Sequence, residues 1–155
     1  MRASQVLEML PFRWHLWIVA RYLPVLAKRS PLKRLLDFAT PARTVPAYEA
    51  LSAEVILQAV TEVTARPLRM RGRRCLREGL LAFRFLSLAG YRPVLHFGLL
   101  PDTARSDHPR AHCWVDLDGR TVLNPATVRT VELFSYNGQG VGSAPEGLRF
   151  EDADA

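Results

Sequence analysis

Residues 75–99, CLREGLLAFRFLSLAGYRPVLHFGL, decide the fold class, because the spacing of their apolar side chains changes part way along. From Cys75 to Ala89 apolar residues occur almost all round a helix, which predicts a central helix that other elements surround. Gly90 suits the left-handed position that ends such a helix. From there to Leu99 apolar and polar residues alternate, as in a β-strand. The stretch therefore predicts a buried helix followed by a sheet, which is an α+β fold.

Residues 111–124, AHCWVDLDGRTVLN, predict an antiparallel hairpin later in the chain. Apolar and polar side chains alternate on both sides of the Asp118-Gly119 pair, which is a strong hairpin signal. A polar loop is expected over 101–109 and a last strand over 128–136. The second half of the chain is therefore expected to form an antiparallel sheet.

The N-terminus is apolar, but polar side chains interrupt it well before the ~20 apolar residues that a membrane span requires: Arg13, His15 and Arg21. Large apolar residues recur at helical spacing and predict a basic amphipathic helix: Trp14, Trp17, Ile18 and Val25. We expect Pro24 to kink or end this helix. Packing of this helix on its own domain is favoured over docking on a membrane or a partner. If the helix docks, the sequence does not decide between a membrane and a partner.

Two further helices are predicted, one over 32–38 and one from Leu51 to before Pro67, with a proline-bounded connector over 40–46 between them. The chain is long enough for one ordinary domain with a single core. We divide it into three expected parts: a helical segment packed on the core (1–48), the core (49–137) and a flexible acidic tail (138–155).

Charge is distributed unevenly along the 155 residues. The first 90 residues carry 15 basic and 6 acidic groups, and the whole chain has a net charge of +6. A basic half fits nucleic acid, an anionic membrane or an acidic peptide. The cations are mostly arginines without Lys-rich tails or Gly-aromatic motifs, so we expect no nucleic-acid partner. Two cysteines and no secretion signal predict a cytoplasmic chain without a structural disulfide.

Cys75 is the candidate nucleophile because it lies in the first turn of the predicted central helix. The positive end of the helix dipole and unpaired backbone N–H groups favour a thiolate there. Arg73 and Arg74 add positive charge, and the N–H of Cys75 can help to hold an oxyanion. A lone cysteine is more often an inert buried residue, so the surrounding sequence must support this role.

Three motifs in this order resemble the transglutaminase-like B2 leader peptidases of lasso-peptide biosynthesis: Cys75-Leu76 opening an apolar helix, Gly90-Tyr91-Arg92-Pro93-Val94 entering a strand, and Ala111-His112-x-Trp114-Val115 followed by Asp118-Gly119-Arg120. The resemblance covers roughly residues 50–124. That family is similar to papain-like folds in setting a cysteine at a helix start against a histidine and an acid on a sheet. The resemblance implies that Cys75 is the nucleophile and His112 the general base.

Asn124 departs from the family pattern, which has an aspartate twelve residues beyond the histidine. An amide can still accept a hydrogen bond from the imidazole and fix its tautomer. A three-residue turn with a bulge would pair Asn124 with Trp114 and place it on the face of His112. A strict two-residue turn would place Asn124 on the opposite face, and Asp116 would then be the better orienting residue.

The remaining candidates are weaker. Trp114 is either a core anchor or a wall of the acyl site, and His96 is an incidental hydrogen-bonded residue or a second base; both are candidate substrate-binding residues. His108 is a loop residue that could line the rim of a substrate cleft, and Cys113 fits the core. No Cys-x-x-Cys or His-x3-His pair is present, so we expect no metal site.

The resemblance implies a cysteine peptidase, without a cofactor, that removes the leader from a ribosomally made lasso precursor through an acyl-enzyme on Cys75. It further implies two partners besides the precursor: a separate small leader-recognition protein and an ATP-dependent asparagine-synthetase-like cyclase. Two alternatives stay open. The same residues could transfer the acyl group to an amine, as in transglutamination, or Asn124 could mark a decayed site in a peptide-docking module.

Overall fold

The computed structural model describes residues 3–65, 73–103, 110–126 and 129–143. Within them the helices come first: α1 (Ala3–Arg29), α2 (Leu32–Ala39), α3 (Pro46–Glu49), α4 (Ala53–Thr64) and α5 (Arg74–Leu88). The strands follow: β1 (Val94–Leu99), β2 (Ala111–Leu117), β3 (Arg120–Leu123), β4 (Val131–Tyr136) and β5 (Val141–Ser143), with a short 3₁₀ helix at Pro101–Thr103 after β1. This order confirms the predicted α+β class.

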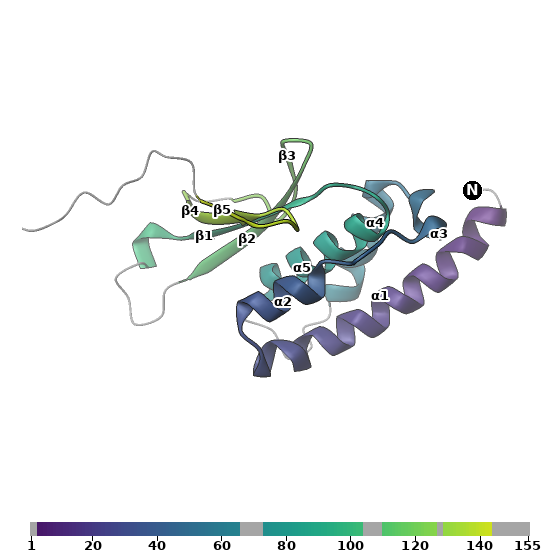
Figure 1. Cartoon of the computed structure of the whole chain (residues 1–155), viewed down its shortest axis with the longest axis horizontal. Helices are drawn as coiled ribbons and strands as arrows, with labels where there is room; N and C mark the ends of the chain where they lie inside the picture. Colours follow the sequence, from purple (N-terminus) through teal and green to yellow (C-terminus); the bar gives the residue numbers. More distant parts are fainter. Residues whose placement is uncertain (1–2, 66–72, 104–109, 127–128, 144–155) are drawn as a thin grey trace, which may run out of the picture.

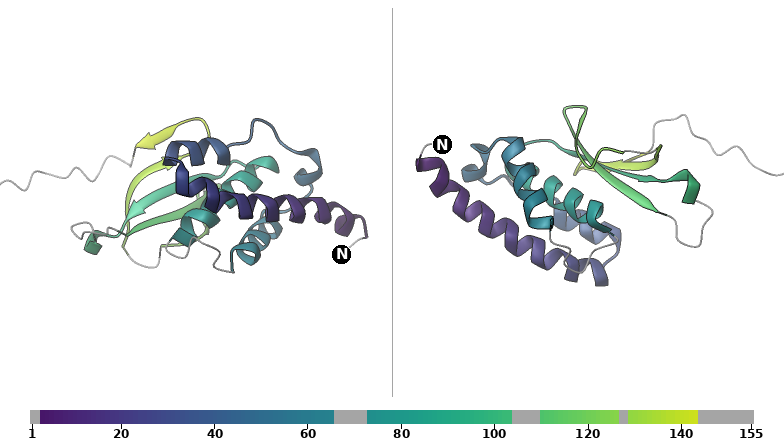
Figure 2. Two further views of the ribbon diagram at one scale, coloured as in Figure 1. Left: turned by 90° about the horizontal axis from the view of Figure 1, so that it is seen from below. Right: turned by 180° about the vertical axis from the view of Figure 1, so that it is seen from behind.

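The strands form one antiparallel sheet in the order β3-β2-β1-β4-β5. Figures 1 and 2 show the helices on one side of this sheet, with α5 between the sheet and α1. Most of α5 is buried, which confirms the prediction of a central, surrounded helix. Leu95, Cys113 and Val115 face it from the sheet side of the core.

α5 packs very closely on the sheet at Gly79. A Cβ atom built there would lie 2.7 Å from Cys113 Sγ and 2.9 Å from Leu95 Cδ1, closer than carbon atoms tolerate. The absence of a side chain at Gly79 therefore sets the distance between the helix and strands β1 and β2.

We expect Gly79→Ala to lower the free energy of unfolding by about 1–3 kcal/mol, because the added methyl group overpacks the interface. Gly140→Ala is the matched control, since no atom of the described residues lies within 4 Å of a Cβ built there. Thermal and urea unfolding of the two variants measures the difference. Equal stability of the two would contradict the close packing at Gly79.

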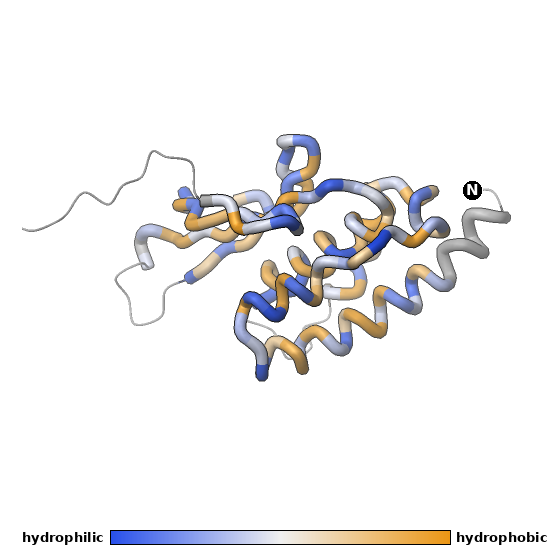
Figure 3. Tube along the Cα trace, viewed as in Figure 1, coloured by the Kyte–Doolittle hydropathy of each residue, from blue (hydrophilic) through white to orange (hydrophobic). Residues whose placement is uncertain are grey.

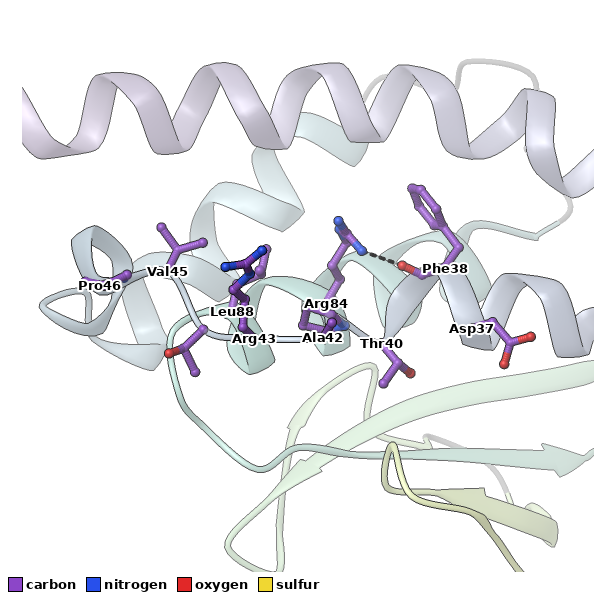
Figure 4. Close-up of a pocket in the computed structure, with 11 residues that line it drawn as sticks. Asp37, Phe38, Thr40, Ala42, Arg43, Val45, Pro46, Arg84 and Leu88 are labelled. Carbon is purple, nitrogen blue, oxygen red and sulfur yellow. Dashed lines mark hydrogen bonds between the residues drawn. The ribbon is translucent and has the colours of Figure 1, made fainter.

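Two arginines of α5 form hydrogen bonds to the main chain of the N-terminal helices α1 and α2. Arg77 Nη2 donates a hydrogen bond of 2.9 Å to the carbonyl of Ala20 in α1. Arg84 Nη1 donates to the carbonyl of Phe38 in α2, and its guanidinium lies 4.9 Å from the centre of the Phe38 ring. Figure 4 shows Arg84 reaching α2 beside a cavity of about 520 Å³ that the 40–46 connector also lines. Burial lowers the pKa of both arginines.

Of the two outcomes expected at Pro24, an end of the helix is wrong, because α1 continues through Pro24 to Arg29. A proline inside a helix removes one hydrogen bond and clashes with the preceding turn, at a cost of about 3 kcal/mol. Burial of apolar side chains on this helix offsets that cost: Phe12, Leu16, Val19, Ala20 and Leu23. Within the described residues, no helix is long and apolar enough to cross a membrane.

The end of the described chain also differs from its prediction. The residues Val141–Ser143 were expected in a flexible tail, but they form β5 and pair with β4. Gly138, with a φ of +88°, lies in the turn that returns the chain to the sheet. Glycine adopts this conformation at no steric cost, so the Gly-rich sequence marks a turn here. Residues 144–155 lie outside the described part.

Candidate active site

Cys75 lies where the sequence analysis expects it, as the second residue of α5. It is half-buried and carries a free thiol. The side chain of Arg73, at the N-cap, makes no capping hydrogen bond to the first turn. The charge of Arg74 is paired with Glu78, since Arg74 Nε lies 2.8 Å from Glu78 Oε1. The backbone N–H groups at the helix start are a source of positive potential near the thiol, and the ion pair with Glu78 reduces the contribution of Arg74.

The β2–β3 hairpin closes through the two-residue turn, which is one of the two turns that the sequence left open. Asp118 and Gly119 have φ values of 51° and 76°, and Leu117 pairs with Arg120. The bulge lies one step further along, because the register shifts so that Leu123 pairs with Val115. The strand therefore ends in the register that the three-residue turn predicts.

Asn124 connects His112 to Cys75. His112 Nε2 donates a 2.9 Å hydrogen bond to the main-chain carbonyl of Asn124. The side-chain amide of Asn124 donates in turn to the carbonyl oxygen of Cys75, at 3.3 Å. Because a carbonyl only accepts, the bond to Asn124 fixes the His112 tautomer with its proton on Nε2, so Nδ1 carries a lone pair that can accept a proton. The contact predicted from the sequence was with the Asn124 side chain, but the imidazole contacts the Asn124 carbonyl.

The backbone of Asn124 is in the left-handed region, with a φ of 53°. Few residues other than glycine adopt this conformation readily, and asparagine is one of them. Left-handed residues that are not glycine often occur at functional sites. An asparagine at this position is therefore compatible with a backbone that presents its carbonyl to His112.

Asp116, the alternative orienting residue, lies away from His112. Its Oδ1 accepts a 2.8 Å hydrogen bond from Thr121 Oγ1, and its Oδ2 lies 3.3 Å from His96 Nε2. The structure therefore places Asn124, and not Asp116, in contact with the ring of His112.

Trp114 stacks between two histidines. Its ring lies 5.2 Å from that of His96 at an interplanar angle of 7°, and 6.0 Å from that of His112 at 19°. His96 Nδ1 is 2.8 Å from Glu132 Oε1. Trp114 is therefore next to the candidate base rather than in the core beneath the sheet. His108 lies outside the described residues.

Cys113 is in the core, as predicted, with 2% of its surface exposed. Burial raises the pKa of its thiol well above the usual value, and the nearby Cys75 raises it further. A thiol held in this way is a poor nucleophile. Among the described residues, no group of three or more His, Cys, Asp or Glu side chains is arranged to hold a metal ion.

The structure brings Cys75, His112 and Asn124 together, but it does not join the thiol directly to the imidazole by a hydrogen bond. Catalytic hydrogen bonds are often long in unliganded enzymes and shorten when substrate binds. Sequence reasoning missed two features: the carbonyl of Asn124 and the carboxylate of Glu132. Both depend on register shifts in the sheet that no residue pattern marks. One shift lies between Val115 and Asp116, and the other lies between Phe97 and Gly98.

Comparison with protein families matches residues 6–134 to the transglutaminase-like superfamily. No curated protein and no solved structure matches the chain. The matched range includes α5 with Cys75 and strands β1 to β3 with His112 and Asn124. The chain therefore belongs to the transglutaminase-like superfamily.

Proposed function

We propose that the chain is a cysteine peptidase that cleaves the leader from a ribosomally made lasso-peptide precursor. The superfamily generally includes cysteine proteases and acyltransferases, and membership supports a cysteine-based enzyme. The observation that most supports the proposal is the link from His112 through Asn124 to Cys75 at the start of α5. The lasso substrate rests on the sequence resemblance.

The proposed chemistry follows from the free Nδ1 of His112. This nitrogen takes the proton of the Cys75 thiol, and the thiolate sulfur attacks the scissile carbonyl to form a tetrahedral oxyanion. Backbone N–H groups at the start of α5 can stabilise that oxyanion. His112 then gives its proton to the leaving amine, and the C–N bond breaks to leave a thioester. Water hydrolyses the thioester, which releases the acid and restores the thiol.

The test is to mix the purified chain with a candidate precursor, with and without the recognition partner, and to measure masses. Hydrolysis gives two fragments whose masses sum to the precursor plus one water. Transfer to an amine instead releases ammonia, and docking alone changes no mass. The proposal requires the first outcome, and either of the others contradicts it.

A separate leader-recognition protein and a cyclase that takes the released core are part of this proposal. The face of α1 turned away from α5 could contact such a partner, because it carries exposed large apolar side chains: Trp14, Trp17, Ile18, Tyr22 and Val25. Apolar residues recur along the coloured length of α1 in Figure 3. Arg21 lies over the ring of Trp17, 4.7 Å from its centre. Trp, Tyr and Arg are the residues that most often dominate protein interfaces.

We expect Arg21→Glu to raise the apparent Michaelis constant for precursor cleavage, or to weaken binding of the recognition protein, with little change in turnover of bound substrate. Arg13 is a poorer probe, because it forms an ion pair with Glu62 of α4. Arg34→Glu on α2 is the control, since it makes the same charge change at another exposed position. A lower melting temperature without a specific binding loss would show that α1 is only structural.

A further inference from the structure

The face of the sheet opposite the helices carries a row of interacting side chains. In β2, His112, Trp114 and Asp116 alternate with Cys113 and Val115, which face α5. No helix of the described residues covers this face (Figures 1 and 2). The row is therefore outside the core that α5 forms with the sheet, and its side chains contact one another.

Gly98 provides the space that the Trp114 ring occupies. It pairs with His112 on β2 and with Glu132 on β4. A Cβ atom built at Gly98 would lie 2.9 Å from Cζ3 of Trp114. The indole therefore lies against a strand position without a side chain, in contact with the ring next to it on each side.

His96 is held at both ring nitrogens. Nδ1 is 2.8 Å from Glu132 Oε1, and Nε2 is 3.3 Å from Asp116 Oδ2. Carboxylates on both sides leave the imidazole little freedom to rotate. The plane of the His96 ring is almost parallel to that of Trp114, at an angle of 7°. The two carboxylate contacts that hold His96 therefore also restrict the indole of Trp114.

We propose that Trp114, held by His96, is the positioning residue for His112: it fixes the plane of the imidazole and stabilises the imidazolium that forms when Cys75 becomes a thiolate. This inference rests on the proposed function. Among the described residues, the His112 ring is hydrogen-bonded at Nε2, to the carbonyl of Asn124, and this bond does not prevent the ring from rotating about the N–H···O axis. The stack with Trp114 supplies the second constraint.

The stack also supplies electrostatic stabilisation. The face of an indole attracts a cation, and the expected gain corresponds to a factor of about 2 to 30 in the population of the thiolate–imidazolium pair. In the resembling family an aspartate supplies negative charge near the base, and this chain has Asn124 instead. The indole face of Trp114 supplies part of the stabilisation of the His112 imidazolium that an aspartate would give.

The pH dependence of Cys75 alkylation by iodoacetamide tests this without any substrate, with peptide mapping to separate Cys75 from Cys113. Among the described residues, the titratable groups of this row are His96, Asp116, Glu132 and His112 itself. If Cys75 and His112 form a thiolate–imidazolium pair, the alkylation rate of Cys75 reaches a plateau near neutral pH. At about pH 10 most thiols ionise without help, so the rate there does not depend on the stack.

We expect Trp114→Leu to lower the neutral plateau about 2- to 30-fold and to leave the rate at high pH unchanged. Trp114→Phe keeps an aromatic face and should stay near wild type, and His96→Gln should lower the plateau less than Trp114→Leu. Val141→Ala, at an exposed apolar position of β5, is the control. If the role of Trp114 were purely structural, Trp114→Leu would change the alkylation rates at neutral pH and at high pH together.

Two results overturn the inference: a wild-type plateau in folded Trp114→Leu, or, where that variant fails to fold, a wild-type plateau in His96→Gln. His112→Ala separates this failure from failure of the proposed function. If His112→Ala keeps the neutral plateau, His112 is not the base and the proposed function is wrong. If it loses the plateau while the Trp114 and His96 variants keep it, only the positioning role is wrong.

Discussion

Cys75→Ala should abolish precursor cleavage, by at least about four orders of magnitude, because the variant has no sulfur to form the acyl-enzyme. The melting temperature should change little, since alanine fits the first turn of α5. Cys113→Ala should keep most of the activity, because the Cys113 thiol is buried and its pKa is raised. Single-turnover cleavage followed by mass spectrometry, with melting curves for both variants, measures these effects.

The comparison of the two cysteines is informative because they lie close together on α5 and β2. Equal activity of the two variants would show that the nucleophile is misassigned. Loss of activity only in Cys113→Ala would lead to the same conclusion. A fall in melting temperature that tracks the fall in activity would instead attribute the effect of Cys75→Ala to folding.

The second large effect is expected at Asn124, where backbone and side chain can be tested separately. Asn124→Val should lower turnover about 100-fold, because a β-branched residue strongly disfavours the φ of 53° that directs the carbonyl to His112. Asn124→Gly keeps this backbone conformation and the carbonyl, and loses only the hydrogen bond to Cys75. Its turnover should stay within about 10-fold of wild type.

Asn124→Ala should fall between these two, and Asp116→Asn should be mild, because Asp116 contacts His96 and Thr121. Turnover is measured at saturating precursor, with melting temperatures as the control for folding. If Asn124→Gly were as impaired as Asn124→Val, the side chain rather than the carbonyl would orient the base. If Asp116→Asn were the crippling change, the contact between Asn124 and His112 would have no part in catalysis.

The elements that carry the candidate site were predictable because local signals specify them. The change of period around Gly90 predicted α5 and the strand after it, and the Asp118-Gly119 pair predicted the hairpin. Both signals concern residues that are neighbours in the chain. The positions of Cys75 at the helix start and of His112 on β2 follow from these elements alone.

The remaining features depend on contacts between residues far apart in the chain. No local residue pattern marks the register shift that brings Leu123 opposite Val115, or the left-handed φ of Asn124 that comes directly after it. Glu132 contacts His96 only because the β1–β4 register shifts beside Gly98. Burial on α5 likewise carries α1 through Pro24, against the local preference of proline.

The contact at Gly79 links the stability of the fold to the dimensions of the reactive centre. Gly79 lies one helical turn beyond Cys75, and Cys113, which it touches, adjoins His112 in β2. Gly79 and Cys113 thus act as a spacer between α5, which carries the thiol, and β2, which carries the imidazole. A spacer one methyl group thicker would move the two reacting groups apart even in molecules that fold fully. Substitutions at this core position are therefore constrained by catalytic geometry as well as by packing.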